Sequence, residues 1–204
     1  ALCPMSSLIS IVPWSQKLAC EVLAPGDLAV DLTAGKGRDT HALAKAVGSA
    51  GQVVAFDLQA AAIEQTTEYL QANNLQVKCW PANHPLPEQP GIYLVQACHS
   101  TLGAVLKSPA KVIMANLGYL PGGDLSLVTR AASTLVALQQ SLSLLVPGGR
   151  LIVTIDPSHP GGEEESGAVD SLLCGLTRDQ WQVLSLHAAN RSEAPYLLVA
   201  ERAL

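Results

Sequence analysis

Four consecutive residues, Asn116-Leu117-Gly118-Tyr119, have the types and spacing that could hold a neutral amine in position as the acceptor of a transferred group. They follow residues 111–115, of which 112–115 are apolar, and so lie at the end of an expected strand. An Asn side-chain carbonyl and a backbone carbonyl can accept the hydrogens of a neutral amine and aim its lone pair, and such orientation supplies up to ~7–11 kcal/mol. The aromatic ring of Tyr119 can stack on a base. An isolated pattern of this kind is equally compatible with a turn in which Asn116 caps and Tyr119 packs.

A second group of polar residues surrounds a glycine turn. Asp31 ends a short apolar strand, Gly35 and Gly37 follow, and a helical pattern then begins. This order presents backbone N–H groups and a helix N-terminus to a nucleotide-like ligand. Twenty residues after Gly37, the apolar run 53–56 ends in Asp57, whose carboxylate can accept both hydroxyls of a ribose.

The spacing within this turn favours one cofactor over another. A dinucleotide fingerprint has Gly or Ala at the third position, which is Thr40 here, so NAD is the weaker candidate. S-adenosylmethionine has no pyrophosphate, and its ammonium group needs carboxylate or carbonyl oxygens. Asp31 at the strand end suits that ligand, although Asp31 could instead cap the turn.

The histidines and the acidic run are less informative. His84 and His159 lie in loops at the same expected rim, where either could take a proton or bind a phosphate, but a lone loop histidine is usually a surface group. We interpret His41, His99 and His187 as structural. The spacing of these residues indicates no metal site. Residues 163–165, three glutamates, are interpreted as a solvated helix start.

The elements that must position these residues alternate between strand and helix. Expected strands are 28–31, 52–56, 76–80, 111–115, 150–155, 181–187 and 196–201, and expected helices are 14–24, 39–47, 60–73, 127–145 and 163–176. Residues 92–107 are interpreted as a helix, with a strand followed by a helix as the alternative. The pattern predicts an α/β, Rossmann-like class I methyltransferase fold: a seven-stranded, mostly parallel sheet with an antiparallel C-terminal hairpin and helices on both faces. Residues 1–204 are expected to form one domain, with 1–13 as a flexible extension.

Composition limits the classes of partner. The 204 residues are 49% hydrophobic and 14% charged, with a net charge of −5, which disfavours a broad surface for coating nucleic acid. Five scattered cysteines favour a reducing compartment over a disulfide framework. No apolar run approaches the ~20 residues of a membrane span, so no membrane partner is expected. The low charge is compatible with a homodimer.

Several motifs in order resemble one family. They are Asp31-x-Thr33-x-Gly35-x-Gly37-x-Asp39-Thr40, Phe56-Asp57-Leu58-Gln59, Asn83-His84, the stretch 116–124, Pro147-Gly148-Gly149 and His159-Pro-Gly-Gly-x-Glu164. Over roughly residues 15–202 the chain resembles the YtqB-like bacterial and plastid proteins described as rRNA methylases, now associated with methylation of tRNA 5-aminomethyl-2-thiouridine (MnmM type). Stretch 116–124 is much more specific than any Gly-x-Gly turn.

The resemblance implies a location, a cofactor and a role for each matching residue. The expected location is the cytoplasm, or the plastid stroma in a plant, and the expected reaction is methyl transfer from S-adenosylmethionine to the aminomethyl nitrogen of a wobble uridine in the tRNA anticodon. The implied methionine-end pocket comprises Asp31, Thr33, Gly35, Gly37, Asp39 and Thr40; the implied ribose and adenine contacts are Asp57, Gln59, Asn83 and His84. The implied catalytic residues are Asn116, Tyr119 and His159, and the implied substrate contacts are Leu117, Gly118, Pro121 and Gly122.

The chain also departs from the family, and other functions compete. Lys36 replaces a common Asn, and residues 85–110 look longer than usual, which suggests a lid or an RNA-facing insert. Twelve Lys and Arg residues are few for a tRNA enzyme; we expect phosphate contacts from Lys36, Arg38, Arg130 and Arg191. The alternatives are methylation of another RNA such as rRNA, methylation of a small-molecule or protein amine, and a non-catalytic module that binds S-adenosylmethionine.

Overall fold

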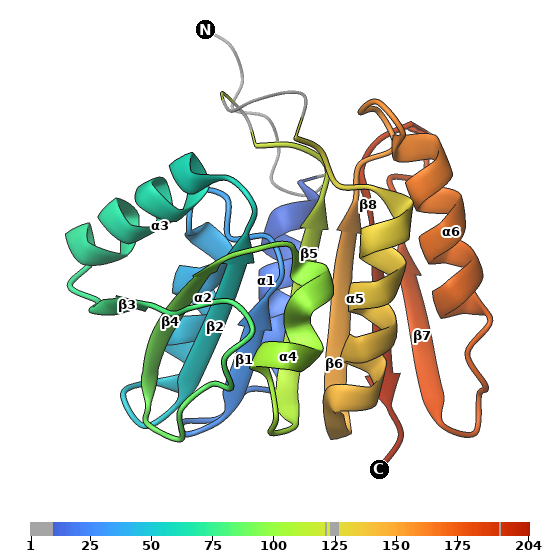
Figure 1. Cartoon of the computed structure of the whole chain (residues 1–204). Coiled ribbons are helices and arrows are strands. Elements are labelled where there is room, and N and C mark those ends of the chain that lie inside the picture. The colour runs from blue at the N-terminus through green and yellow to red at the C-terminus, as the bar shows by residue number, and fades with distance from the viewer. Residues whose placement is uncertain (1–9, 121, 123–126, 192) are drawn as a thin grey trace, which may run out of the picture.

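The computed structural model describes residues 10–120, 122, 127–191 and 193–204, and across them eight strands form a single sheet in the order β3-β4-β2-β1-β5-β6-β8-β7 (Figure 1). The strands are β1 (Leu28–Asp31), β2 (Gln52–Asp57), β3 (Val77–Cys79), β4 (Gly91–Gln96), β5 (Ala110–Leu117), β6 (Leu145–Ile155), β7 (Trp181–Leu186) and β8 (Tyr196–Arg202). The helices are α1 (Ile11–Cys20), α2 (Arg38–Val47), α3 (Ala60–Ala72), η2 (His99–Thr101), α4 (Leu102–Val105), α5 (Ala131–Leu144) and α6 (Gly162–Cys174).

The predicted α/β class and the C-terminal hairpin are confirmed. Strands β1 to β6 pair in parallel, whereas β8 pairs antiparallel with both β6 and β7. Helices α4, α5 and α6 cover the face of the sheet turned toward the viewer in Figure 1, and α1, α2 and α3 pack against the opposite face. The helix expected at 14–24 begins earlier, at Ile11, so residues 11–13 belong to α1 rather than to a flexible extension. Residues 1–9 lie outside the described residues.

Strand β4 is the main correction to the predicted fold. Residues 92–107 were expected to be helical, but 91–96 form a strand between β3 and β2, which raises the strand number from seven to eight. Tyr93 and Val95 pack into the core on one face, and Ile92 and Leu94 into the core on the other. A strand buried on both faces is a continuous apolar run, so periodicity does not distinguish it from a helix.

The same observation corrects the expected insert. Residues 91–96 are in register with β2, Val53 opposite Ile92 and Ala55 opposite Leu94. The short helix α4 that follows buries Leu102 and Val105 against the sheet. This part of the 85–110 segment is therefore core structure and not a lid.

Among the described helices, none combines the length and the apolar character that a membrane span requires.

Candidate active site

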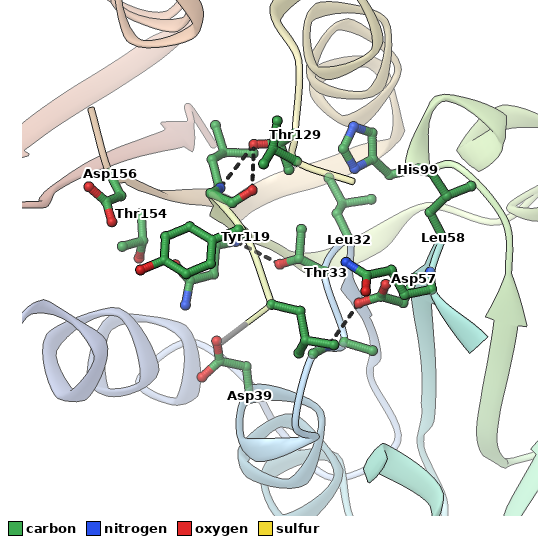
Figure 2. Close-up of a pocket in the computed structure, with 18 of the residues that line it drawn as sticks. Leu32, Thr33, Asp39, Asp57, Leu58, His99, Tyr119, Thr129, Thr154 and Asp156 are labelled. Carbon is green, nitrogen blue, oxygen red and sulfur yellow. Dashed lines mark hydrogen bonds between the residues drawn. The ribbon is translucent and has the colours of Figure 1, made fainter. Parts of the chain in front are cut away.

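A cavity of about 480 Å³ opens at the carboxyl ends of β1, β2, β4 and β5, the edge where ligands bind in open α/β sheets. Figure 2 shows Tyr119, Thr154 and Asp156 on one side of it and Asp57, Leu58 and His99 on the other. Its described lining is Ile11, Val12, Leu32, Thr33, Ala34, Gly35, Lys36, Arg38, Asp39, Asp57, Leu58, Gln59, Ala97, Cys98, His99, Asn116, Leu117, Gly118, Tyr119, Leu120, Leu127, Val128, Thr129, Ser133, Thr154, Asp156 and Pro195.

The glycine turn between β1 and α2 forms the floor of this cavity. Gly37 has a φ of 77°, and a Cβ there would lie 3.1 Å from the Cα of Thr66 in α3, so only glycine allows this close approach. Asp31 is buried beneath the turn, where it accepts hydrogen bonds from the Thr33 N–H at 3.0 Å and the Thr40 hydroxyl at 2.6 Å. Asp31, Gly37 and Thr40 therefore shape the turn from below, while Thr33, Gly35 and Asp39 line the cavity.

The carboxyl groups around the turn favour a positively charged ligand. Burial, followed by the nearby charge of Asp39, raises the pKa of Asp31 to about 7. Burial also raises the pKa values of Asp39 and Asp57, although Gln16 donates a hydrogen bond to Asp39 at 2.7 Å. A cation bound beside Asp39 would stabilise the ionised forms of all three groups. The ammonium and sulfonium charges of S-adenosylmethionine suit this arrangement.

Asp57 and its neighbours can hold a nucleoside. The two Asp57 carboxyl oxygens accept the backbone N–H groups of Gly35 and Gln59, both at 2.9 Å, which fixes the carboxyl group at the cavity wall with lone pairs left for ribose hydroxyls. Leu58 is 54% exposed and presents an apolar surface there. The Gln59 side chain donates to the Leu127 carbonyl at 3.2 Å and joins this wall to the chain before α5.

His99 replaces Asn83 and His84 at this end of the cavity. His99 follows β4, the strand beside β2, and it lines the cavity, a position that the interpretation of His99 as structural did not predict. Its buried Nε2 has no hydrogen-bond partner among the described residues, and burial lowers the pKa of the imidazole. Asn83 and His84 are exposed in the loop after the edge strand β3 and are not part of the described lining. Because residues 91–96 were expected to be helical, the sequence did not predict that His99 follows a strand end at the cavity.

The opposite side of the cavity is open to solvent. Asn116 is exposed at the end of β5, where its backbone N–H donates to the Thr33 hydroxyl at 2.7 Å. Tyr119 is 45% exposed and pairs with Val128 in an isolated antiparallel bridge. Leu117 and Gly118 lie between them and also line the cavity. Asn116 and Tyr119 can therefore reach a molecule that enters from outside.

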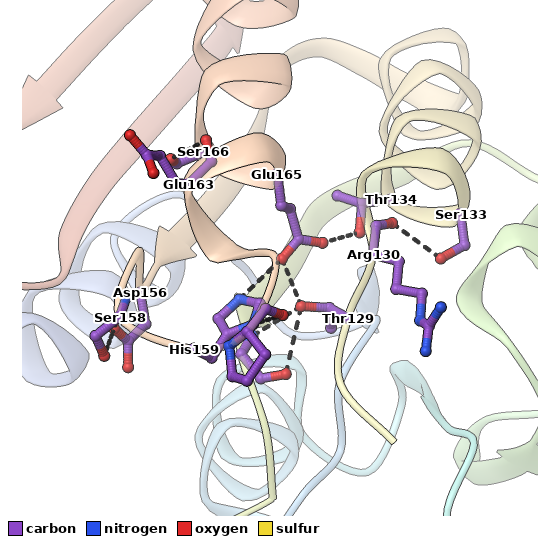
Figure 3. Close-up of polar contacts among 12 residues, drawn as sticks. Thr129, Arg130, Ser133, Thr134, Asp156, Ser158, His159, Glu163, Glu165 and Ser166 are labelled. Atoms are coloured by element: carbon purple, nitrogen blue, oxygen red, sulfur yellow. Dashed lines mark hydrogen bonds and ion pairs between the residues drawn. The ribbon is translucent and has the colours of Figure 1, made fainter. Parts of the chain in front are cut away.

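Two of the predicted residues, Gly122 and His159, do not reach this open side. Pro121 lies outside the described residues, and Gly122 is exposed and absent from the described lining. The His159 ring is buried beneath Gly118, and its Nε2 lies 3.2 Å from Glu165 (Figure 3). Glu165 itself is only 1% exposed, which corrects the expectation that residues 163–165 are all solvated. Within the described residues, no three His, Cys, Asp or Glu side chains are grouped so that they could hold a metal ion.

A doubly covered, mostly parallel sheet with this polar cavity at its carboxyl edge is the Rossmann-like fold of methyltransferases. The chain belongs to the family described as "Putative rRNA methylase", whose model matches residues 53–202. It is 34% identical over 199 residues to the chloroplastic tRNA (mnm(5)s(2)U34)-methyltransferase of Arabidopsis thaliana. That match covers 93% of this chain, and the chain spans 66% of the length of that relative.

Solved structures agree with this family. A "putative rRNA-methylase" from Clostridium thermocellum has a TM-score of 0.82 at 33% identity, with 94% of this chain and 96% of that chain covered. A "putative methyltransferase" from Streptococcus mutans, in complex with SAH, has a TM-score of 0.78 at 28% identity, with 94% and 97% covered.

Proposed function

We propose that the protein uses S-adenosylmethionine to methylate the aminomethyl nitrogen of 5-aminomethyl-(2-thio)uridine at the wobble position of tRNA. The named activity of the Arabidopsis relative supports this substrate. The observation that carries the proposal is the exposed pair Asn116 and Tyr119 on the open side of a cavity whose other side suits an adenosyl group.

The residues of the chain divide between cofactor and acceptor. When bound, S-adenosylmethionine supplies an electrophilic methyl group on a positively charged sulfur. The Asp39 carboxylate would bind the ammonium group, Asp57 the ribose hydroxyls, and Leu58 would cover the adenine ring. These contacts use groups whose pKa values are raised by burial and which a cationic ligand stabilises.

The acceptor amine is oriented by hydrogen-bond acceptors. The side-chain carbonyl of Asn116 and the backbone carbonyl of Leu117 accept hydrogen bonds from the two N–H groups of the amine. The nitrogen lone pair therefore points away from these two oxygens. Tyr119 stacks on the uracil ring, which holds the nucleoside while the amine is aimed. Because the side chains need only orient the amine, the rate gain is mainly one of positioning.

The decisive experiment supplies S-adenosylmethionine labelled in the methyl group and tRNA carrying the unmethylated aminomethyl group. We expect nucleoside mass spectrometry to show one added methyl on the wobble nucleoside. Asn116→Ala is expected to lower the rate at least about 100-fold while cofactor affinity, measured by calorimetry, stays within twofold. Retained transfer in this variant would refute the role of Asn116.

The competing functions give different results in the same assay. Methylation of rRNA or of a small amine, with none on tRNA, would show that the proposed substrate is wrong and that the proposed type of reaction is right. Cofactor binding with no transfer to any acceptor would indicate a non-catalytic module. The location we propose is the cytoplasm or, as for the chloroplastic relative, the plastid.

A further inference from the structure

Glu165 connects the loop after β6 to the start of α5, 31 to 36 residues earlier in the sequence. One of its carboxyl oxygens accepts the Thr129 hydroxyl at 2.6 Å and lies 3.2 Å from the His159 Nε2; the other accepts the Thr134 hydroxyl at 2.5 Å (Figure 3). Thr129 precedes α5, Thr134 lies in its first turn, and His159 lies in the loop after β6. A carboxyl group only 1% exposed is costly to bury unless its acceptor sites are used, and here both oxygens are used.

Thr129 links Glu165 to Gly118, which lies between the proposed acceptor contacts Asn116 and Tyr119. The Gly118 N–H donates to the Thr129 hydroxyl oxygen at 2.9 Å, and the Thr129 N–H donates to the Gly118 carbonyl at 2.9 Å. A threonine hydroxyl has one hydrogen, and at 2.6 Å that hydrogen belongs to Glu165, which leaves the oxygen lone pairs free to receive Gly118. Without Glu165, the hydroxyl could turn toward the Gly118 carbonyl, 3.4 Å away.

The orientation of Gly118 determines that of the preceding carbonyl. Gly118 has a φ of 145°, which other residues rarely adopt, and the hydrogen bond that its N–H donates to Thr129 favours one orientation of the Leu117–Gly118 peptide. Because the peptide is planar and trans, the Leu117 carbonyl points opposite to the Gly118 N–H. The contact with Thr129 therefore fixes the direction of the Leu117 carbonyl, one of the two acceptors that the proposed function assigns to the amine.

We propose that Glu165 is a positioning residue for methyl transfer: through Thr129 it holds the Leu117–Gly118 peptide in the orientation that aims the acceptor amine. This proposal rests on the proposed function. Glu165 does not line the cavity, so its effect on the reaction is indirect. The hydrogen bonds from Thr129 to Glu165 and from Gly118 to Thr129 are called the relay below. Thr134 uses the other oxygen of Glu165 and has no described contact with Gly118, so it anchors Glu165 without taking part in the relay.

The variants separate the relay from general stability. Glu165→Gln has one acceptor oxygen in place of two and cannot accept from both threonines, and Thr129→Val removes the acceptor of the Gly118 N–H. Thr129→Ser keeps the hydroxyl, and Thr134→Val is the matched control, because it removes a buried hydrogen bond of Glu165 on the other oxygen. We expect Glu165→Gln and Thr129→Val to lower kcat about 10- to 100-fold with cofactor affinity unchanged. Thr129→Ser and Thr134→Val are expected to stay within about threefold of the unaltered protein.

A second readout does not depend on methylation. Amide hydrogen exchange without any ligand is expected to rise at residues 117–119 in Glu165→Gln and Thr129→Val, and to be unchanged there in Thr129→Ser and Thr134→Val. If the unaltered protein does not methylate tRNA, the proposed function fails and the exchange data alone decide whether the relay exists. Equal effects of Thr134→Val and Thr129→Val on kcat or exchange would overturn the proposal, as would unchanged kcat and exchange in either Thr129→Val or Glu165→Gln. If Glu165→Gln does not fold, the Thr129 pair decides.

Discussion

Among single residues, the buried acids under the glycine turn have the strongest electrostatic consequences. Asp31, Asp39 and Asp57 all have raised pKa values with burial as the largest cause, and none forms an ion pair among the described residues. Such groups destabilise the folded protein when they ionise, unless a cation is bound beside them. Without a bound cation these acids therefore lower the free energy of unfolding, by an amount that depends on pH.

The pKa of Asp31 predicts how stability changes with pH. Its folded-state pKa of about 7 lies above the ordinary value of 3.8, so its stabilising contribution is complete below about pH 4 and is lost as the pH rises through 7. We expect the Tm measured without ligand to fall by a few degrees more over this interval than in Asp31→Asn, which keeps the shape of the protonated acid. Asp179→Asn, a change at an exposed acid, is the control and should retain the full slope. An unchanged slope in Asp31→Asn would contradict the assignment.

At the scale of elements, the position of β4 decides which loop reaches the nucleoside end of the cavity. Because β4 lies beside β2, the residues that follow it, and not those after β3, stand next to Asp57. His99→Ala is expected to weaken S-adenosylmethionine binding about tenfold, the effect of one hydrogen bond of about 1.4 kcal/mol. His84→Ala, the matched control in the exposed loop, should bind normally in the same calorimetric titration. Equal losses of affinity in His99→Ala and His84→Ala would contradict the placement of His99, and not His84, at the cofactor.

The sequence was informative where a short segment determines its own structure. The Gly35–Gly37 turn, Asp57 and Asn116 could be placed because a strand end and a turn define each position. His99 and Glu165 could not, because their roles depend on which strands are neighbours and on which helix packs behind the acceptor loop. An apolar run such as 92–95 is compatible with helix or strand until its partners are known. A run of three glutamates likewise does not reveal which one points inward.

Helix α1 is a second element whose attachment affects the site. Arg150 of β6 donates to the Leu18 carbonyl of α1 at 2.8 Å and to Glu201 of β8 at 2.6 Å, while Gln16 of α1 contacts Asp39. Arg150→Met is expected to lower the free energy of unfolding by about 1–3 kcal/mol, measured by urea denaturation, because it removes partly buried hydrogen bonds of a charged group. The KM for S-adenosylmethionine should rise as α1 loosens. Arg178→Met, at an exposed arginine, is the control; an unchanged KM in Arg150→Met would show that α1 acts independently of the cavity.

For the whole molecule, the proposed function requires an acidic chain to bind a polyanion. The net charge of −5 and the 12 Lys and Arg residues leave little for long-range attraction, so contacts with phosphates must be few and local. Lys36 and Arg38 are exposed at the rim of the cavity and also border a neighbouring hollow lined by Tyr69. Neither forms an ion pair among the described residues, so both are free to meet a phosphate beside the acceptor.

This arrangement predicts that the affinity for tRNA depends only weakly on salt concentration, and that a few residues account for this dependence. Each phosphate contact contributes about 0.9 to the slope of log affinity against log salt concentration for a duplex and about 0.7 for a single strand. We therefore expect Lys36→Ala to reduce the slope by about 1, measured by fluorescence anisotropy with labelled tRNA at several salt concentrations. Lys107→Ala is the matched control, because Lys107 precedes β5 and so lies at the opposite edge of the sheet from the cavity. Equal slopes in the unaltered protein and in Lys36→Ala would place the RNA on another surface. A reduced slope in Lys36→Ala alone would locate the RNA backbone at the glycine turn, within reach of Asn116.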